Sequence, residues 1–144
     1  MKTPNSSLLT AHSRLQDALG TLKLLTTPEQ YEVITDAMLG EEGDHFIEII
    51  DCIHATWQAM PKTYESIEKG HAALAQLHYF IGGCDWWIVE KDADPDSAGQ
   101  VQAFGVADLG MGAELGYISI PELLENGAEL DLYFTAKTIG EILG

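Results

Sequence analysis

The spacing of apolar residues changes near residue 72, and this change constrains the fold more than any other feature of the sequence. Before it, apolar residues recur at helical intervals; after it, they alternate or cluster with β-formers and glycines. Helices followed by antiparallel strands are typical of an α+β protein. We therefore predict a helical N-terminal half, residues 1–72, packed on a C-terminal, mainly antiparallel sheet of four or five strands, residues 73–144, with both halves in one compact unit.

The first half is expected to contain three helices. Thr27 and Pro28 predict the start of the second helix, because threonine caps helices and proline suits their first position, and Gln30 completes a capping box. The third helix carries an apolar stripe in which we expect the large side chains of Phe46 and Trp57 to be buried. The expected helices cover residues 7–25, 28–39 and 44–60, with Asp44 as the cap of the third and Pro61 after its end.

The second half is expected to form strands joined by tight turns. Gly82 and Gly83 predict a two-residue hairpin turn, because glycine supplies the positive φ that such turns need. Trp86 and Trp87 are adjacent, so on a strand they point to opposite faces, one of them toward the core. The expected strands cover residues 75–81, 86–90, 101–107, 116–120 and 130–134, with a short helix after Pro121 and a last helical turn at 139–143.

The charge of the chain is strongly acidic and excludes several classes of partner. The 144 residues include 23 acidic and 7 basic side chains, a net charge of −16, with Arg14 as the only arginine. Such a chain cannot neutralise a run of phosphates, which argues against direct binding to nucleic acid or to an anionic membrane. The favoured partners are basic surfaces, including the nucleic-acid-binding faces of other proteins. The alternative is that the acidic surface serves only solubility.

The small number of cysteines and the lack of long apolar runs predict a cytoplasmic location. Cys52 and Cys84 are too few for a disulfide framework, so we expect two reduced thiols. The N-terminus lacks the apolar core of a signal peptide. No apolar run approaches the ~18 residues that a membrane span requires.

Two places in the sequence raise the possibility of a metal site. Asp92, Asp94 and Asp96 resemble the start of a calcium loop, but Ser97 and Ala103 stand where an EF-hand requires glycine and glutamate. The third helix carries acids and histidines, but a di-metal bundle takes a Glu-x-x-His unit from each of two helices, and the other two expected helices carry none. A solvated loop and an acidic helix face are the preferred interpretations, so we predict no metal and no cofactor.

Other chemical motifs are equally incomplete. Four glycines lie between Gly105 and Gly116, but their spacing does not match the glycine motif that binds dinucleotides. We therefore expect turns and tight strand crossings there. No Gly-x-Ser-x-Gly elbow is present. His78 and Cys84 could face each other across the first hairpin, although an acidic setting disfavours a reactive thiolate. The sequence therefore predicts a protein that is not an enzyme.

Several segments of the C-terminal half resemble one family of bacterial proteins. These segments are Leu77-His78-Tyr79-Phe80, Asp85-Trp86, Glu90-Lys91-Asp92, Phe104-Gly105, Glu114-Leu115-Gly116-Tyr117 with Ser119, Glu122-Leu123, Asp131-Leu132-Tyr133-Phe134 and Ile139-Gly140-Glu141-Ile142. They are similar to a domain of unknown function found in plasmid- and phage-borne proteins. The resemblance implies an origin in a mobile element, often near genes that counter host restriction. It implies no reaction and assigns no catalytic residue.

Two functions from different classes are expected. The preferred one is an interaction protein of a mobile element that inhibits a host defence nuclease complex, as anti-CRISPR and antirestriction proteins do, by occupying a basic nucleic-acid-binding surface. A second copy of the chain, in a homodimer, is a further candidate partner. The rival is a small metal-dependent enzyme that uses the third helix or the 92–96 loop. The residues expected to bind the partner are Glu41, Glu42, Asp44, Glu48, Asp51, Asp92, Asp94 and Asp96.

Overall fold

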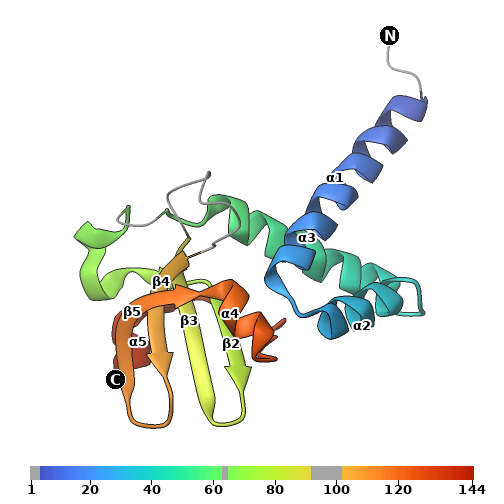
Figure 1. Cartoon of the computed structure of the whole chain (residues 1–144). Helices are drawn as coiled ribbons and strands as arrows, with labels where there is room; N and C mark the ends of the chain where they lie inside the picture. Colours follow the sequence, from blue (N-terminus) through green and yellow to red (C-terminus); the bar gives the residue numbers. More distant parts are fainter. Residues whose placement is uncertain (1–3, 63–64, 92–101) are drawn as a thin grey trace. The chain divides into compact units, whose positions relative to one another are not determined.

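The computed structural model describes residues 4–62, 65–91 and 102–144 (Figure 1). It confirms the α+β class, with helices in the N-terminal part and an antiparallel sheet in the C-terminal part. The chain divides into two compact units, Met1–Gln58 and Ala59–Gly144, which are described separately. The boundary lies earlier than residue 72 because the segment after the helices is bonded to the sheet unit. The Lys91 N–H donates to the Pro61 carbonyl (2.9 Å), and the Ser66 N–H donates to the Glu90 carboxylate (3.0 Å).

The first unit contains three helices, and their capping follows from the sequence. The Gln30 N–H donates to Thr27 Oγ1 (3.1 Å), and Pro28 occupies the first turn, so the predicted helix start is confirmed. The third helix begins one residue before Asp44, which therefore lies in its first turn and is not its cap. A carboxylate there is favoured by the helix dipole. The helices are α1 (Pro4–Leu25), α2 (Pro28–Met38) and α3 (Gly43–Ala59).

Branched and small aliphatic side chains form the buried part of the first unit. The Thr21 hydroxyl and His54 Nδ1 lie 2.7 Å apart and join α1 to α3. Phe46 and Trp57 were expected to be buried, and this prediction is wrong: both are half-buried, because the isoleucines of α3 occupy its buried face. The buried apolar residues are Ala18, Leu22 and Leu25 on α1, Ile34 on α2, and Ile49, Ile50 and Ile53 on α3.

The second unit is built around a five-stranded sheet in which every neighbouring pair is antiparallel. Its strand order is β5-β4-β3-β2-β6, and a separate two-stranded sheet joins β1 to β7. The strands are β1 (Leu74–Ala75), β2 (Leu77–Ile81), β3 (Cys84–Glu90), β4 (Gln102–Asp108), β5 (Ala113–Ser119), β6 (Glu129–Leu130) and β7 (Lys137–Thr138). The helices of this unit are the 3₁₀ helix η1 (Ile67–Ala72), α4 (Ile120–Glu125) and α5 (Ile139–Leu143).

The turns between strands agree with the glycine pattern. Ile81 pairs with Cys84, so Gly82 and Gly83 form the predicted two-residue turn, with φ of 56° at Gly82. Gly110 and Gly112 have φ of 96° and 108° in the turn from β4 to β5, as expected for turn glycines. The predicted strand at 130–134 is wrong in length, because the chain leaves the sheet after Leu130.

The two faces of the sheet are each partly buried. Tyr79 and Ile88 lie on one face, and Val89 and Val106 on the other, where they join a core cluster with Ile139 of α5. Figure 1 shows α5 behind the strands in this view. Trp86 and Trp87 are both half-buried, and Trp87 packs against that cluster. Neither tryptophan is therefore fully exposed on the sheet.

Burial of Tyr79 leads to a prediction about alkaline stability. Tyr79 is fully buried, and burial raises the pKa of its phenol above the usual value of 10.0. The unfolded chain therefore loses this proton near pH 10 while the folded chain keeps it. Stability is unaffected by Tyr79 below that pH and should fall above it by about 1.4 kcal/mol per pH unit.

Urea unfolding between about pH 8 and pH 11 measures this effect. The Tyr79→Phe variant should lose this part of the alkaline decline, whereas Tyr133→Phe, a change at an exposed tyrosine, should keep it. If Tyr79→Phe and the original chain decline with the same slope, the buried phenol is not responsible.

Candidate functional site

The five acidic residues predicted on and before the third helix lie in one region of the first unit. Glu41 and Glu42 occupy the turn between α2 and α3, and Asp44, Glu48 and Asp51 lie on α3. All five are exposed. The three on α3 are spaced by four and three residues, so they share one face of the helix. The structure therefore brings together the predicted residues of this segment.

Three further exposed carboxylates lie on α2, and they were not among the residues predicted from the sequence. Glu29, Glu32 and Asp36 are exposed and share one face of α2, because they are spaced by three and four residues. Residues 28–59 contain eight Asp and Glu residues and no Lys or Arg. The absence of basic residues between Lys23 and Lys62 is the feature of the sequence that could have identified the carboxylates of α2. We call these eight exposed residues of α2, α3 and their connecting turn the acidic surface.

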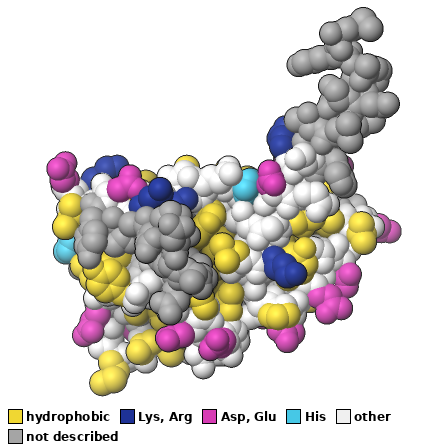
Figure 2. All heavy atoms as spheres, turned by 45° about the horizontal axis from the view of Figure 1, so that its top comes forward, with side chains coloured by type: hydrophobic (Ala, Val, Ile, Leu, Met, Phe, Trp, Pro, Cys, Tyr) yellow, Lys and Arg dark blue, Asp and Glu magenta, His cyan; other side chains and the backbone are white. Residues whose placement is uncertain are grey.

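Part of the acidic surface is concave. Glu41, Glu42, Asp44 and His45 line a shallow hollow of about 400 Å³. Within the described ranges, no three His, Cys, Asp or Glu side chains are placed to hold a metal ion together. A hollow lined mainly by exposed carboxylates attracts basic side chains through charge. Figure 2 shows that acidic side chains are scattered widely over the face drawn.

The other predicted cluster, Asp92, Asp94 and Asp96, lies outside the residues that the structure describes. Its part in partner binding, like the rival hypothesis of a metal-dependent enzyme that uses this loop, stays a prediction.

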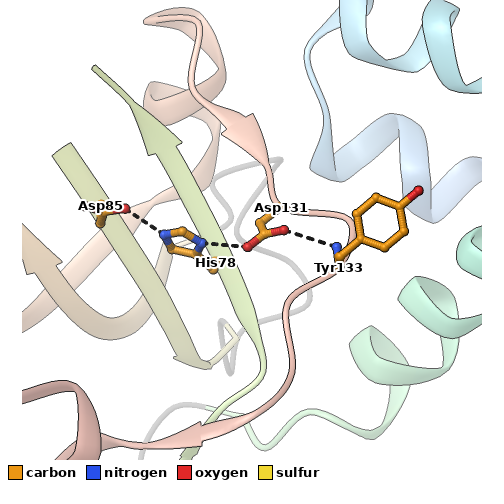
Figure 3. Close-up of polar contacts among 4 residues, drawn as sticks. All are labelled: His78, Asp85, Asp131 and Tyr133. Atoms are coloured by element: carbon orange, nitrogen blue, oxygen red, sulfur yellow. Dashed lines mark hydrogen bonds and ion pairs between the residues drawn. The ribbon is translucent and has the colours of Figure 1, made fainter. Parts of the chain in front are cut away.

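A second polar site lies on the sheet of the second unit, where a histidine is held between two carboxylates (Figure 3). His78 Nε2 lies 2.8 Å from Asp85 Oδ1, and His78 Nδ1 lies 3.1 Å from Asp131 Oδ2. The other oxygen of Asp131 accepts the Tyr133 N–H at 3.1 Å. Each ring nitrogen of His78 therefore lies within hydrogen-bonding distance of one carboxylate oxygen. The cluster thus ties β2 to β3 and to the segment after β6.

Aromatic rings surround His78 and complete this site. The imidazole stacks on Trp87 at 5.2 Å between ring centroids and on Phe80 at 5.9 Å, and Phe134 lies at 5.6 Å. Both ring nitrogens of His78 contact carboxylates, so the histidine links its own strand to Asp85 and to Asp131.

His78 and Cys84, which could have faced each other across the first hairpin, do not meet. The register of the first hairpin pairs His78 with Trp87 and pairs Cys84 with Ile81. Side chains alternate between the two faces along a strand, and paired residues lie on the same face. Cys84 pairs with the odd-numbered Ile81, whereas His78 is even-numbered, so Cys84 and His78 lie on opposite faces of the sheet. The register thus agrees with the expectation that these two residues are not a reactive pair.

A third site is an apolar pocket of about 280 Å³ in the second unit. Its charged member is Glu90, which is 3% exposed and accepts from the Ser66 N–H (3.0 Å) and the Ser66 hydroxyl. These bonds replace the water that the carboxylate loses on burial. The pocket is lined by Ser66, Ile67, Gly70, His71, Ala73, Glu90, Phe104, Leu115 and Ile139.

Comparisons with known proteins assign no family to the chain. No family model, no curated protein and no solved structure matches it. The resemblance of the C-terminal half to a family of plasmid- and phage-borne proteins therefore stays a prediction. Among the described helices, none is long and apolar enough to cross a membrane.

Proposed function

We propose that the protein is a non-enzymatic, acidic interaction protein of a mobile genetic element. It inhibits a host defence nuclease complex, of the CRISPR or restriction type, by occupying the basic surface that binds nucleic acid. The observation that carries this proposal is the acidic surface, where eight exposed carboxylates on α2, α3 and their turn lie in a segment without a single Lys or Arg.

The spacing of the carboxylates supports the proposal. Asp44, Glu48 and Asp51 are separated along the axis of α3 by about 6 Å and about 4.5 Å, given the rise of a helix. One strand of DNA carries a charge per ~3.4 Å of axis, so the density of negative charge on this face is of the same order. A groove lined by Lys and Arg therefore attracts both a DNA strand and the acidic face of α3. The electric field of such a groove steers the acidic protein toward the groove.

The test reverses the charge of three residues together, because a single exposed pair contributes only about 0.2–1 kcal/mol. In Asp44→Lys/Glu48→Lys/Asp51→Lys, binding to a purified CRISPR effector or restriction enzyme should weaken about tenfold at low salt, chiefly through slower association. The difference should shrink as salt screens the charges. Surface plasmon resonance at two or more salt concentrations measures both rates.

A matched control carries the same change of net charge elsewhere. Glu122, Glu125 and Glu129 are exposed residues of the second unit, and their reversal to lysine should weaken binding far less. The reversal of Asp92, Asp94 and Asp96 tests the second predicted cluster in the same assay. If neither the α3 variant nor the 92–96 variant binds more weakly than the control, the proposed use of the acidic clusters is wrong.

A further inference from the structure

Strand β5 forms an edge of the sheet that no other described strand covers. It pairs with β4 on one side and is the last strand in the order. Its seven residues, Ala113–Ser119, include one charged side chain, Glu114, and neither Lys nor Pro. Leu115 and Tyr117 are 43% and 55% exposed. Sheet edges are usually protected by lysine, proline or bulges, so a long apolar edge of this kind is suited to pair with another strand.

The apolar pocket lies beside this edge and on the same face as its exposed side chains. Leu115 pairs with Val106, and Tyr117 pairs with Phe104, with which it makes an edge-to-face contact at 5.6 Å. Leu115, Phe104 and Ile139 line the pocket. In strand addition, main-chain hydrogen bonds provide affinity and pockets for alternate side chains provide specificity. The described part of the second unit has both parts, an edge that no other described strand covers and a pocket that the edge strand itself lines.

We propose that the edge of β5 that no described strand covers binds an extended segment of a basic partner protein by strand addition, with one apolar side chain of that segment in the pocket lined by Leu115, Phe104 and Ile139. This inference rests on the proposed function in one respect, since it takes the partner to be basic. It adds a second contact, separate from the acidic surface, and gives the chemical pattern of the bound segment.

The negative charge of the chain favours a basic segment over a second copy of the chain as the strand that pairs with β5. On the added strand, alternate residues lie on the pocket side, next to Leu115 and Tyr117, and must be apolar. The remaining residues of the added strand lie on the other face, which carries Glu114, so basic side chains at these positions are favoured by charge. A second copy of the chain is the poorer occupant, because it brings another Glu114 and another net charge of −16 to the same edge.

The probe is the blocked heptapeptide acetyl-Lys-Val-Lys-Leu-Lys-Val-Lys-amide, titrated into the full chain and followed by backbone amide shifts. The expected result is that the largest shifts fall in β5 and in the residues lining the pocket. The Leu115→Lys/Tyr117→Lys variant should bind at least about tenfold more weakly, because lysine protects a sheet edge and repels the peptide. A peptide with proline in place of both valines, or with glycine in place of leucine, should also lose most of its binding.

The control variant introduces two lysines at apolar positions of the first unit. Val33 and Leu39 are 67% and 82% exposed, so Val33→Lys/Leu39→Lys makes the same change of charge beside the acidic surface. It should leave the shifts in β5 intact. If the edge variant fails to fold, as circular dichroism will show, Tyr117→Lys alone replaces it.

Three results would overturn the inference. One is equal binding by the edge variant and the original chain. Another is a set of shifts confined to α2 and α3, which would mean that the peptide binds the acidic surface. The third is a dimer in light scattering that the edge variant abolishes, which would mean that a second copy occupies β5. These outcomes leave the nuclease-binding assay of the α3 reversals untouched, so the two proposals can fail separately.

Discussion

Replacing Gly105 by alanine is expected to destabilise the second unit by about 3 kcal/mol, at the upper end of the usual cost of overpacking. Gly105 pairs with Ile88 in the middle of the sheet, next to a register shift between Ile88 and Glu90. A Cβ atom at this position would overlap the carbonyl oxygen of Trp87, a backbone atom that cannot rotate away. The β3 and β4 strands must therefore separate, which disturbs the core cluster around Val106.

The cross-strand partner of Gly105 provides the control. Gly116 pairs directly with Gly105, and a Cβ atom added to Gly116 would meet no atom within 4 Å. Gly116→Ala should change stability by less than about 0.5 kcal/mol or increase it slightly, because alanine lowers the entropy of the unfolded chain. Urea titrations of both variants measure the difference. Equal destabilisation by the two substitutions would mean that the β3–β4 contact at Gly105 is not as close as described.

The His78→Phe variant is expected to lose about 2 kcal/mol of stability. A hydrogen bond to a charged group contributes about 1.5–3 kcal/mol, and His78 makes one to each of two carboxylates. The side chains of Asp85 and Asp131 are 37% and 31% exposed, so solvent screening reduces the total. Phenylalanine keeps a ring next to Trp87, so the variant removes the polar contacts with little change in packing.

A second substitution distinguishes lost hydrogen bonds from lost packing. Without His78, Asp85 and Asp131 remain as like charges on one side of the sheet, so Asp131→Asn in the His78→Phe background should restore part of the lost stability. The same change in the original chain should be destabilising, because it removes a charged acceptor. His71→Phe, at an exposed histidine, serves as a control and should have little effect. Unchanged stability in His78→Phe would contradict the described bridge.

Local patterns in the sequence predicted the elements of the fold well. The α+β class, the cap at Thr27 and the turn at Gly82 each follow from neighbouring residues, and the structure confirms them. The fifth strand was wrong in length, because Asp131 turns the chain by accepting the Tyr133 N–H. The burial of Phe46 and Trp57 was wrong, because a helical period does not tell which residues of an apolar stripe face the core and which lie at its border.

Contacts between distant residues could not be predicted from local patterns. Asp131 meets His78 because β6 pairs with β2, and nothing near either residue in the sequence indicates this pairing. The pocket beside Glu90 likewise depends on segments before, within and after the sheet. The acidic residues of α3 were predicted because their spacing is local. Those of α2 were missed, although the absence of Lys and Arg from residues 28–59 marked them.

Competition with nucleic acid is the most direct test of the proposed function. A purified nuclease complex of the CRISPR or restriction type is loaded with fluorescently labelled nucleic acid, and fluorescence anisotropy is recorded as the acidic protein is added. The account predicts that the protein releases the nucleic acid and that the concentration required rises with the concentration of nucleic acid. The Asp44→Lys/Glu48→Lys/Asp51→Lys variant should release it less effectively at low salt. Simultaneous binding of the protein and the nucleic acid to the same complex would contradict the account.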